Sequence, residues 1–445
     1  MSNFVKNTTI TFGSKVVSFI GGVGTSIILA RLLGPEGKGI YRLAILLPTL
    51  VVTFTNFGIG PATIYHVGQN KHERKTILGN NNLLATVIAL ISILAGLLLI
   101  IGFRGELFED VPVRFLYIGL ALIPLKLFSQ YSRKLLLGLQ EIKKYNLSMI
   151  IQRVTFLSLL GFVLGGLKAG ILGAIMAIIA SFMVALSASL YWSFSAIGKT
   201  DHKINLPYIK DVTSYGIKAH LGNIIGFLNY RFDMFLVSAF LNPSSVGFYS
   251  IAVGMSEKLW LISKPAATVL FPQISSETDK QRRKEFTPIV SRNVFLITSL
   301  GALALYFLSE WVVILLYSSS FLPSIRPLQI LLPGIVAMSV DRVLSNDLAG
   351  RGKPLLNTYM GLITVTTNIS LNIIWIPKYG IEGAALASMI AYSIELIGTL
   401  LIYWHFSGNS PFITMIPQKS DLKIYKKYSS KLYRKLISNM DHLTK

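Results

Sequence analysis

Long apolar stretches separated by short polar turns run through almost the whole chain. A helix that crosses the hydrocarbon core of a bilayer needs roughly 20 mainly apolar residues. Stretches of that kind lie near residues 8–33, 39–65, 80–103, 112–138, 146–167, 170–194, 213–241, 246–272, 290–313, 328–350, 356–377 and 382–405. The pattern therefore predicts an all-α integral membrane protein of about 12 transmembrane helices joined by short connections.

A repeat is visible between the two halves of this pattern. Residues 33–41 (LGPEGKGIY) match residues 241–249 (LNPSSVGFY) at an offset of 208, and 168–174 match 378–384 at an offset of 210. The nearly equal offsets favour a duplication, although Gly and Pro turns recur in any polytopic protein. Because six spans is an even number, both halves would enter the membrane from the same side, as parallel repeats around a central cavity.

This organisation predicts three parts of the chain. Residues 1–200 form an N-terminal six-helix half and residues 201–405 a C-terminal six-helix half. Residues 406–445 form a basic cytoplasmic tail. Tyr and Leu recur at helical spacing among the lysines of this tail, which favours an amphipathic helix on anionic lipid headgroups. A disordered tail is the alternative.

Composition narrows the class of protein further. Of the 445 residues, 52% are apolar and 14% are charged, whereas a soluble chain carries about 25% charged residues. The 42 basic and 20 acidic residues give a net charge of +22. A nucleic-acid-binding protein gathers its bases on a soluble face, but here they fall between apolar runs, so no nucleic-acid partner is expected. The lack of cysteine in the sequence excludes disulfides and thiolate metal sites.

The distribution of Lys and Arg sets the predicted orientation. If the N-terminus is cytoplasmic, the cytoplasmic segments hold 26 of these residues, the opposite side holds 6, and the spans hold 10. Bases accumulate in cytoplasmic loops, so we expect a multi-pass protein of the cell (plasma or inner) membrane with both termini in the cytoplasm. The N-terminus lacks a short apolar stretch ending in a small-residue cleavage site, so the first run is expected to remain as a helix.

Three motifs stand out at residues 28–41 (ILARLLGPEGKGIY), 229–233 (NYRFD) and 270–275 (LFPQIS). They resemble motifs of polysaccharide flippases, in the superfamily that also contains multidrug and toxin extruders and the lipid II flippase. The resemblance covers about residues 1–405, and it implies export of a lipid-diphosphate-linked oligosaccharide from the cytoplasmic leaflet. The lipid II branch carries an Arg-Asp pair in its first helix, where this chain reads Gly21-Gly22-Val23-Gly24. This departure argues against a role in peptidoglycan precursor export.

Charges inside the predicted spans agree with an anionic substrate. An ionisable residue within a span costs several kcal/mol and should face a cavity or a partner. If every acid pairs with a base, five positive charges remain, and charge-assisted contacts make diphosphate a suitable ligand. A drug-cation exporter would need the reverse balance. The bases are Lys15, Arg31, Arg42, Lys126, Arg153, Lys218, Arg231, Lys258, Lys264 and Arg342, and the acids are Asp233, Glu257, Asp341, Asp347 and Glu395.

Four of these bases are candidates for diphosphate binding. Lys15 and Lys218 open corresponding helices of the two halves and could flank the cytoplasmic mouth, with interfacial snorkelling as the alternative. Lys126 lies deeper in its span and either lines the cavity or forms a buried structural pair. Arg231 could reach the cavity from the seventh span. By contrast, Arg31, Arg42 and Arg153 lie within two turns of a helix end and are expected to snorkel.

Three acids have coupling or structural roles open to them. Asp233 is two residues from Arg231, so the two side chains leave the helix on different faces. We expect Asp233 to anchor helix packing through a base on another helix. Glu257 and Glu395 could carry a coupling proton or cation, or could be paired structurally.

The leading hypothesis is a flippase that moves a prenyl diphosphate-linked oligosaccharide to the outer leaflet by alternating access, for surface polysaccharide biosynthesis. A small-molecule or drug antiporter of the same superfamily is the alternative, and a membrane-embedded glycosyltransferase or polymerase is a third. The sequence lacks Asp-x-Asp, Walker and His-Glu-x-x-His motifs, so no enzyme activity, cofactor or metal is expected. Expected partners are the lipid-linked substrate, membrane lipids, a coupling proton or cation, and a polysaccharide polymerase with its glycosyltransferases.

Overall fold

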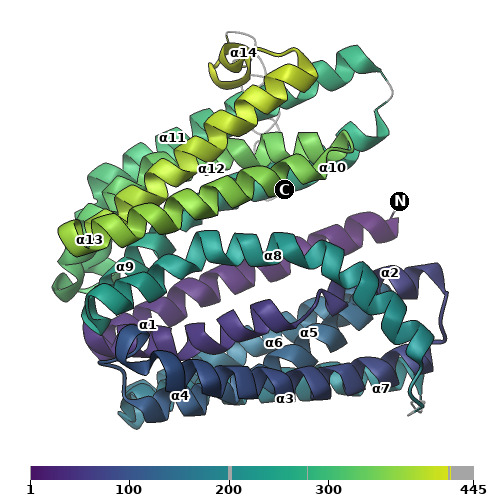
Figure 1. Ribbon diagram of the computed structural model, residues 1–445, viewed down its shortest axis with the longest axis vertical. Coiled ribbons are helices and arrows are strands. Elements are labelled where there is room, and N and C mark those ends of the chain that lie inside the picture. Colours follow the sequence, from purple (N-terminus) through teal and green to yellow (C-terminus); the bar gives the residue numbers. More distant parts are fainter. Residues whose placement is uncertain (1, 199–202, 278, 419–420, 422–445) are drawn as a thin grey trace, which may run out of the picture. The chain divides into compact units, whose positions relative to one another are not determined.

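The computed structural model describes residues 2–198, 203–277, 279–418 and 421, and within them it contains helices and no strands (Figure 1). This agrees with the predicted all-α class. In chain order the helices are α1 (Ser2–Thr55), α2 (Ile59–Gln69), α3 (Arg74–Leu107), α4 (Val113–Leu120), α5 (Leu122–Gly138), α6 (Ile142–Leu160), η1 (Gly161–Gly166), α7 (Gly170–Ile197), α8 (Leu206–Phe240), α9 (Pro243–Ser256), η2 (Glu257–Leu259), α10 (Trp260–Ser276), α11 (Lys280–Tyr317), η3 (Ser319–Ser324), α12 (Ile325–Gly350), α13 (Pro354–Ser407) and α14 (Pro411–Met415).

Two of these helices are interrupted at a glycine with positive φ. A straight helix of 54 residues, the length of α1 and of α13, would be about 81 Å long, far more than a bilayer core of about 30 Å. Gly34 (φ 68°) interrupts α1 and Gly380 (φ 59°) interrupts α13, both with non-helical backbone. Glycine reaches this left-handed region without a Cβ penalty, so each long helix holds two of the predicted spans.

Within the described residues, eight helices are long and apolar enough to cross a membrane, which confirms a multi-span membrane protein. Because α1 and α13 each contain two predicted spans, these eight helices account for ten of the twelve. The remaining two fall on α8 and on α9–η2–α10, which do not pass the same test of length and apolarity. The complete set of twelve spans therefore stays a prediction, as does the tail helix, most of which lies outside the described residues.

The backbone supports the repeat at one pair of positions. Gly170 has a φ of 60° and Gly380 a φ of 59°, and these glycines correspond at the offset of 210. Three residues later, a Cβ atom on Gly173 would lie 2.3 Å from Val163, and one on Gly383 would lie 2.3 Å from the carbonyl oxygen of Trp375. Both turns therefore press a glycine onto the preceding helix. The parallel two-repeat arrangement itself stays a prediction.

The described chain divides into two compact units. The first comprises residues up to Ala252, with Glu310–Pro327 and Ile369–Ala384. In it α3, α5, α6 and α7 run side by side, and α6 also packs against α1 (Figure 1). Helix α8 belongs to this unit as well, because Gly58 and Gly216 let α2 and α8 meet at the backbone. A Cβ atom on Gly58 would lie 2.2 Å from the carbonyl oxygen of Gly216.

Polar side chains fix the start of α8 to α3. The amide of Asn80 donates to the carbonyl of Lys203 at 3.1 Å and accepts the N–H of Asn205 at 2.9 Å. The hydroxyl of Tyr208 donates to Asn81 Oδ1 at 2.7 Å, and both of these side chains are buried. The connection into the second half of the chain is therefore bonded to the first half.

The second unit is built around α12. Val340 and Leu344 of α12 pack with Leu400 and Tyr403 of α13, while Val343 packs with α10 and α11. Lipid tails are as apolar as these side chains, so close packing rather than hydrophobic burial holds such helices together. The predicted boundary at residue 200 divides the chain by sequence repeat, whereas these two units divide it by compactness. The boundary therefore stays a prediction.

Candidate functional site

Two cations of the first unit lie near each other inside the helical bundle. Lys126 of α5 is half-buried, and its Nζ donates to the hydroxyl of Thr49 on α1. Arg42 of α1 lies close enough to Lys126 for the two positive charges to interact. Arg42 Nε also donates to Met234 Sδ of α8 at 3.3 Å. The structure therefore places cations from two helices near each other, and one of them, Arg42, also contacts α8.

Arg153 extends this group from a third helix. It lies on α6 over Gly21 of α1, where a Cβ atom would be only 2.6 Å from Arg153 Cγ. Its Nε is buried and has no hydrogen-bond partner among the described residues. Tyr41 is in electrostatic range of both Arg153 and Arg42. We call Arg42, Lys126 and Arg153 the cation cluster.

Two members of the cation cluster, Lys126 and Arg153, have no compensating charge beside them in the described part of the chain. Among the described residues, neither Lys126 nor Arg153 makes an ion pair, since no carboxylate lies within 4.0 Å of their nitrogens. Burying an unpaired positive charge is costly, and like charges repel each other more strongly in a medium of low dielectric constant. An anion with several oxygens would remove both costs. The arrangement therefore suits a phosphate or diphosphate group.

Sequence reasoning identified only Lys126 of this cluster. Arg42 and Arg153 were expected to snorkel toward a helix end, but the structure turns both toward other helices. Gly21 carried the one available signal. It belongs to the glycine-rich segment where the lipid II branch has a charged pair, and an arginine from α6 occupies the space above it.

The other predicted bases are two exposed lysines and one half-buried arginine that is hydrogen-bonded within its own helix. Lys15 of α1 and Lys218 of α8 are both exposed, and among the described residues neither makes an ion pair. Arg231 of α8 is half-buried and its Nη1 donates to the carbonyl of Tyr230 at 2.6 Å. Their roles in substrate binding stay predictions.

The three candidate acids lie on three different helical elements, α8, η2 and α13. Asp233 is 3% exposed, and its Oδ2 accepts a hydrogen bond from the hydroxyl of Tyr249 on α9 at 2.7 Å. This contact joins two consecutive helices, as an anchoring residue should, while the expected base partner stays a prediction. Glu257 lies in the 3₁₀ segment η2 and Glu395 on α13, both half-buried.

The second unit holds a further group of cations. The Arg342 guanidinium lies 3.8 Å from the centroid of the Trp260 ring, and Lys264 Nζ lies 5.5 Å from it. Trp260 Nε1 donates to the carbonyl of Ile335 at 3.3 Å, which fixes the ring. Lys264 follows Trp260 by four residues, so helical spacing could have predicted that contact. The approach of Arg342, on another helix, carries no local signal.

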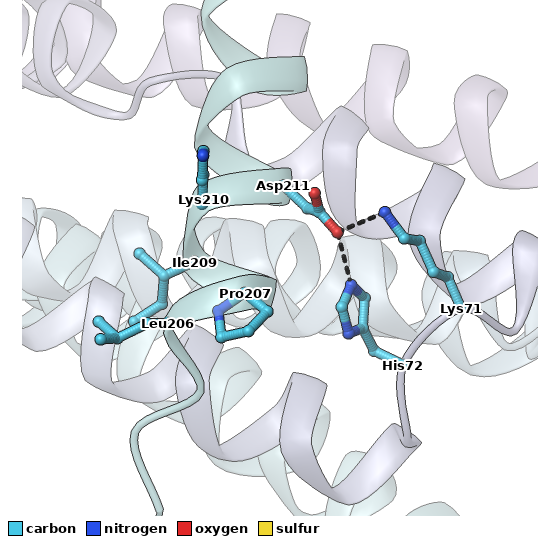
Figure 2. A pocket seen from close by; sticks show the side chains of 7 residues that line it. All are labelled: Lys71, His72, Leu206, Pro207, Ile209, Lys210 and Asp211. Carbon is cyan, nitrogen blue, oxygen red and sulfur yellow. Dashed lines mark hydrogen bonds and ion pairs between the residues drawn. The ribbon is translucent and has the colours of Figure 1, made fainter.

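A polar surface group lies where the α2–α3 connection meets α8. Figure 2 shows Lys71 and His72 both directed at the carboxylate of Asp211, at 2.6 and 2.9 Å. Hydrogen bonds from Lys71 and, with a smaller effect, from His72 lower the pKa of Asp211. These side chains border an open hollow of about 780 Å³ that Leu206 and Pro207 also line. None of the cation cluster lines this hollow.

No group of three or more His, Cys, Asp or Glu side chains within the described ranges could hold a metal ion. The chemistry available inside the helices is thus that of arginine, lysine and hydroxyl groups. Such groups can bind and orient an anion through charge-assisted hydrogen bonds.

Comparisons with known proteins add to this geometry. A family model described as polysaccharide biosynthesis protein matches residues 4–278. A probable low-salt glycan biosynthesis flippase of Haloferax volcanii is 25% identical over 83% of this chain and 76% of its own length. A putative O-antigen transporter of Shigella flexneri is 24% identical over 91% of this chain and 98% of its own length. The solved structure of a lipid II flippase in an inward closed conformation matches with a TM-score of 0.75, at 17% identity, over 97% of this chain and 100% of that chain. That structural match shows a shared fold.

Proposed function

Because this chain belongs to the polysaccharide biosynthesis protein family, as its sequence motifs predicted, we propose that it is a flippase for a prenyl diphosphate-linked oligosaccharide. The substrate moves from the cytoplasmic to the outer leaflet by alternating access, for surface polysaccharide biosynthesis. The relatives named as a glycan biosynthesis flippase and an O-antigen transporter support this substrate class.

The cation cluster is the observation that carries the proposal. Within the part of the chain that the structure describes, Lys126 and Arg153 have no carboxylate within ion-pair distance, and Arg42 adds a third positive charge nearby. A protein retains such a destabilising arrangement where a ligand supplies the missing negative charge. A diphosphate that crosses the membrane loses hydrogen bonds to water, so the protein must supply other donors. Planar guanidinium groups provide paired donors for phosphate oxygens.

The flippase proposal also gives roles to the other residues predicted from the sequence. Lys15 and Lys218 guide the diphosphate at the cytoplasmic mouth, and Arg231 binds it further along the path. Glu257 and Glu395 are the places to seek a coupling proton or cation. Residues 1–200 and 201–405 act as the two rocking halves, with both termini in the cytoplasm and the basic tail on anionic lipids. Polysaccharide polymerase and glycosyltransferases are the expected protein partners.

The two alternatives differ in what they require of this cluster. A drug antiporter that exports cations needs intramembrane acids facing its substrate, whereas Lys126 and Arg153 would repel a cation. A glycosyltransferase or polymerase needs catalytic carboxylates or a metal outside the membrane. The named relatives are transporters and flippases rather than enzymes, which supports a non-enzymatic function.

The test compares ligand binding by the purified protein and two variants. Arg153→Gln and Lys126→Gln should each weaken binding of a prenyl diphosphate-linked glycan about tenfold to hundredfold, since a charge-assisted hydrogen bond contributes about 1.5–3 kcal/mol. Lys144→Gln is the matched control, because it removes one positive charge from α6 that is already paired with Glu141. Glycan export in a host that lacks its own flippase should fall in parallel.

Two results would contradict the assignment. If both variants fold and bind the glycan with the affinity of the parent protein, the cation cluster does not bind substrate. If the parent protein binds lipophilic cations more tightly than the glycan, the result would favour the drug antiporter.

A further inference from the structure

Helices α1 and α9 touch at their backbones in the first unit. A Cβ atom on Gly39 of α1 would lie 1.7 Å from the carbonyl oxygen of Pro243 on α9. A Cβ atom on Gly247 of α9 would lie 2.1 Å from the carbonyl oxygen of Pro35 on α1. Real Cβ atoms do not approach other atoms this closely, so any residue other than glycine at either position must separate the two helices.

The two contacts are reciprocal. Pro35 corresponds to Pro243 and Gly39 to Gly247, both at an offset of 208, which is the offset of the sequence repeat. Gly39 of one repeat thus contacts Pro243 of the other, and Gly247 contacts Pro35. Contact of i with j′ and of j with i′ is the signature of a two-fold axis between identical surfaces. The approach therefore lies on the pseudo-symmetry axis that relates the two repeats.

Side chains beside this contact join the same two repeats. Arg31 of α1 donates to the carbonyl oxygens of Leu316 at 2.9 Å and Leu315 at 2.5 Å on α11. Lys38 Nζ lies 5.0 Å from the centroid of the Tyr317 ring. All of these residues fall at the predicted outer ends of their spans. Backbone packing and a guanidinium bridge thus act together at one end of the molecule.

We propose that the reciprocal contact of Pro35 and Gly39 with Pro243 and Gly247 is the outer closure of the transport path. The inference rests on the proposed alternating access, in which the two repeats must separate at this end to release substrate. Contacts between small residues consist of individually weak dispersion and Cα–H···O interactions. They can therefore break and re-form in each transport cycle, and glycine is required because closure brings backbone onto backbone.

Cysteine labelling tests the closure directly, because the sequence contains no cysteine. Thr49→Cys, beside Lys126, places a unique thiol on the inner side of the contact. In the parent this thiol should react slowly with a membrane-impermeant maleimide applied from outside intact cells. Gly39→Ala or Gly247→Ala should each raise the labelling rate at least fivefold. The labelling rate of the double variant should be no more than about twice that of either single variant, because both substitutions break the same contact.

Two further variants separate closure from general damage. Gly254→Ala is the matched control on α9, since a Cβ atom there meets nothing within 4 Å, and its labelling should equal that of the parent. Arg31→Ala should raise labelling without any steric change, by removing the bridge to α11. Unchanged labelling in Gly39→Ala, Gly247→Ala and Arg31→Ala would overturn the closure. So would additive effects of the two glycine substitutions, which would indicate separate packing defects.

The labelling assay requires no glycan, so it is independent of the proposed substrate. Increased labelling in the glycine variants of a protein that exports no glycan would support the closure and contradict the flippase assignment. Unchanged labelling in a protein that does export glycan would support the assignment and contradict the closure.

Discussion

Two arginines of this protein, the buried Arg292 and the half-buried Arg153, differ in whether a carboxylate accompanies them. In the second unit, Arg292 of α11 forms two parallel hydrogen bonds to Asp421, at 2.8 and 2.9 Å, and a third to the carbonyl of Ile413 at 2.7 Å. In the first unit, Arg153 has a buried Nε without a partner among the described residues. The first arrangement satisfies every demand of a buried guanidinium, and the second leaves part of it unmet.

The difference separates a structural charge from a functional one. Removing one member of a buried, satisfied pair exposes the other to an apolar environment and is strongly destabilising. Removing an unsatisfied charge relieves a cost, so stability should hold while ligand binding is lost. Stability and binding measured on the same variants can therefore tell the two classes apart.

The largest effect on stability should come from breaking the satisfied pair. Arg292→Ala leaves the Asp421 carboxylate buried without its partner, so the free energy of unfolding should fall by about 3–5 kcal/mol. Thermal unfolding of the purified protein in detergent measures the change. Arg282→Ala is the control, because its pair with Asp279 is exposed and spans 3.8 Å, and it should cost less than about 1 kcal/mol. An equal effect of both variants would contradict the comparison.

A change in the opposite direction is expected in the cation cluster. Lys126→Met keeps a long side chain beside Thr49 but removes its positive charge. The free energy of unfolding should stay constant or rise by up to about 2 kcal/mol, while glycan binding is lost. A destabilisation of more than about 1 kcal/mol in the same thermal assay would show that Lys126 is a structural residue.

A smaller effect should follow at the start of α8. Tyr208→Phe removes the hydroxyl that donates to Asn81 Oδ1 at 2.7 Å, leaving a buried amide oxygen with one donor fewer. The expected loss is about 1–2 kcal/mol. Tyr215→Phe is the matched control, since its ring is 40% exposed and stacks on Tyr65, and it should change stability by less than about 0.5 kcal/mol. Limited proteolysis after Lys203 would report the loosened connection.

The smallest effect should be the acid dependence of the Arg292–Asp421 pair. Hydrogen bonds from Arg292 lower the pKa of Asp421. A lowered pKa in the folded state stabilises the protein above the ordinary value, about 3.9, and this contribution disappears as pH falls through the lower folded pKa. The difference in melting temperature between the parent and Asp421→Asn should therefore be constant from pH 7 to pH 5 and shrink below about pH 4. A difference that vanished between pH 7 and pH 5 would contradict this linkage.

The fold followed from the sequence wherever apolar length alone decides the outcome. Ten predicted spans lie in helices that are apolar enough to cross a membrane, and Gly34 with Pro35 already marked the turn inside α1. Helix α8 is more polar, since it carries Arg231 and Asp233 among its apolar residues, and does not pass the same test. Hydropathy measures average solvation, so it loses the helices whose polar residues face protein instead of lipid.

The candidate site was less accessible from the sequence because its contacts join distant helices. Distance from a helix end suggested snorkelling for Arg153, but its side chain occupies the space that the missing side chain of Gly21 leaves free, 132 residues earlier in the chain. Arg292 and Asp421 are likewise 129 residues apart. Only the repeat gave long-range information, since its offset of 208 relates Pro35 to Pro243 and Gly39 to Gly247, the four residues of the contact between α1 and α9.

The two hydrogen bonds of Asn80 have a consequence for how such a protein could be encoded. Because Asn80 binds Lys203 and Asn205 directly, the beginning of the second half would remain attached even if the chain were interrupted just before Lys203. Two shorter genes, one for each half, would then encode polypeptides that could still form these two hydrogen bonds without a covalent link.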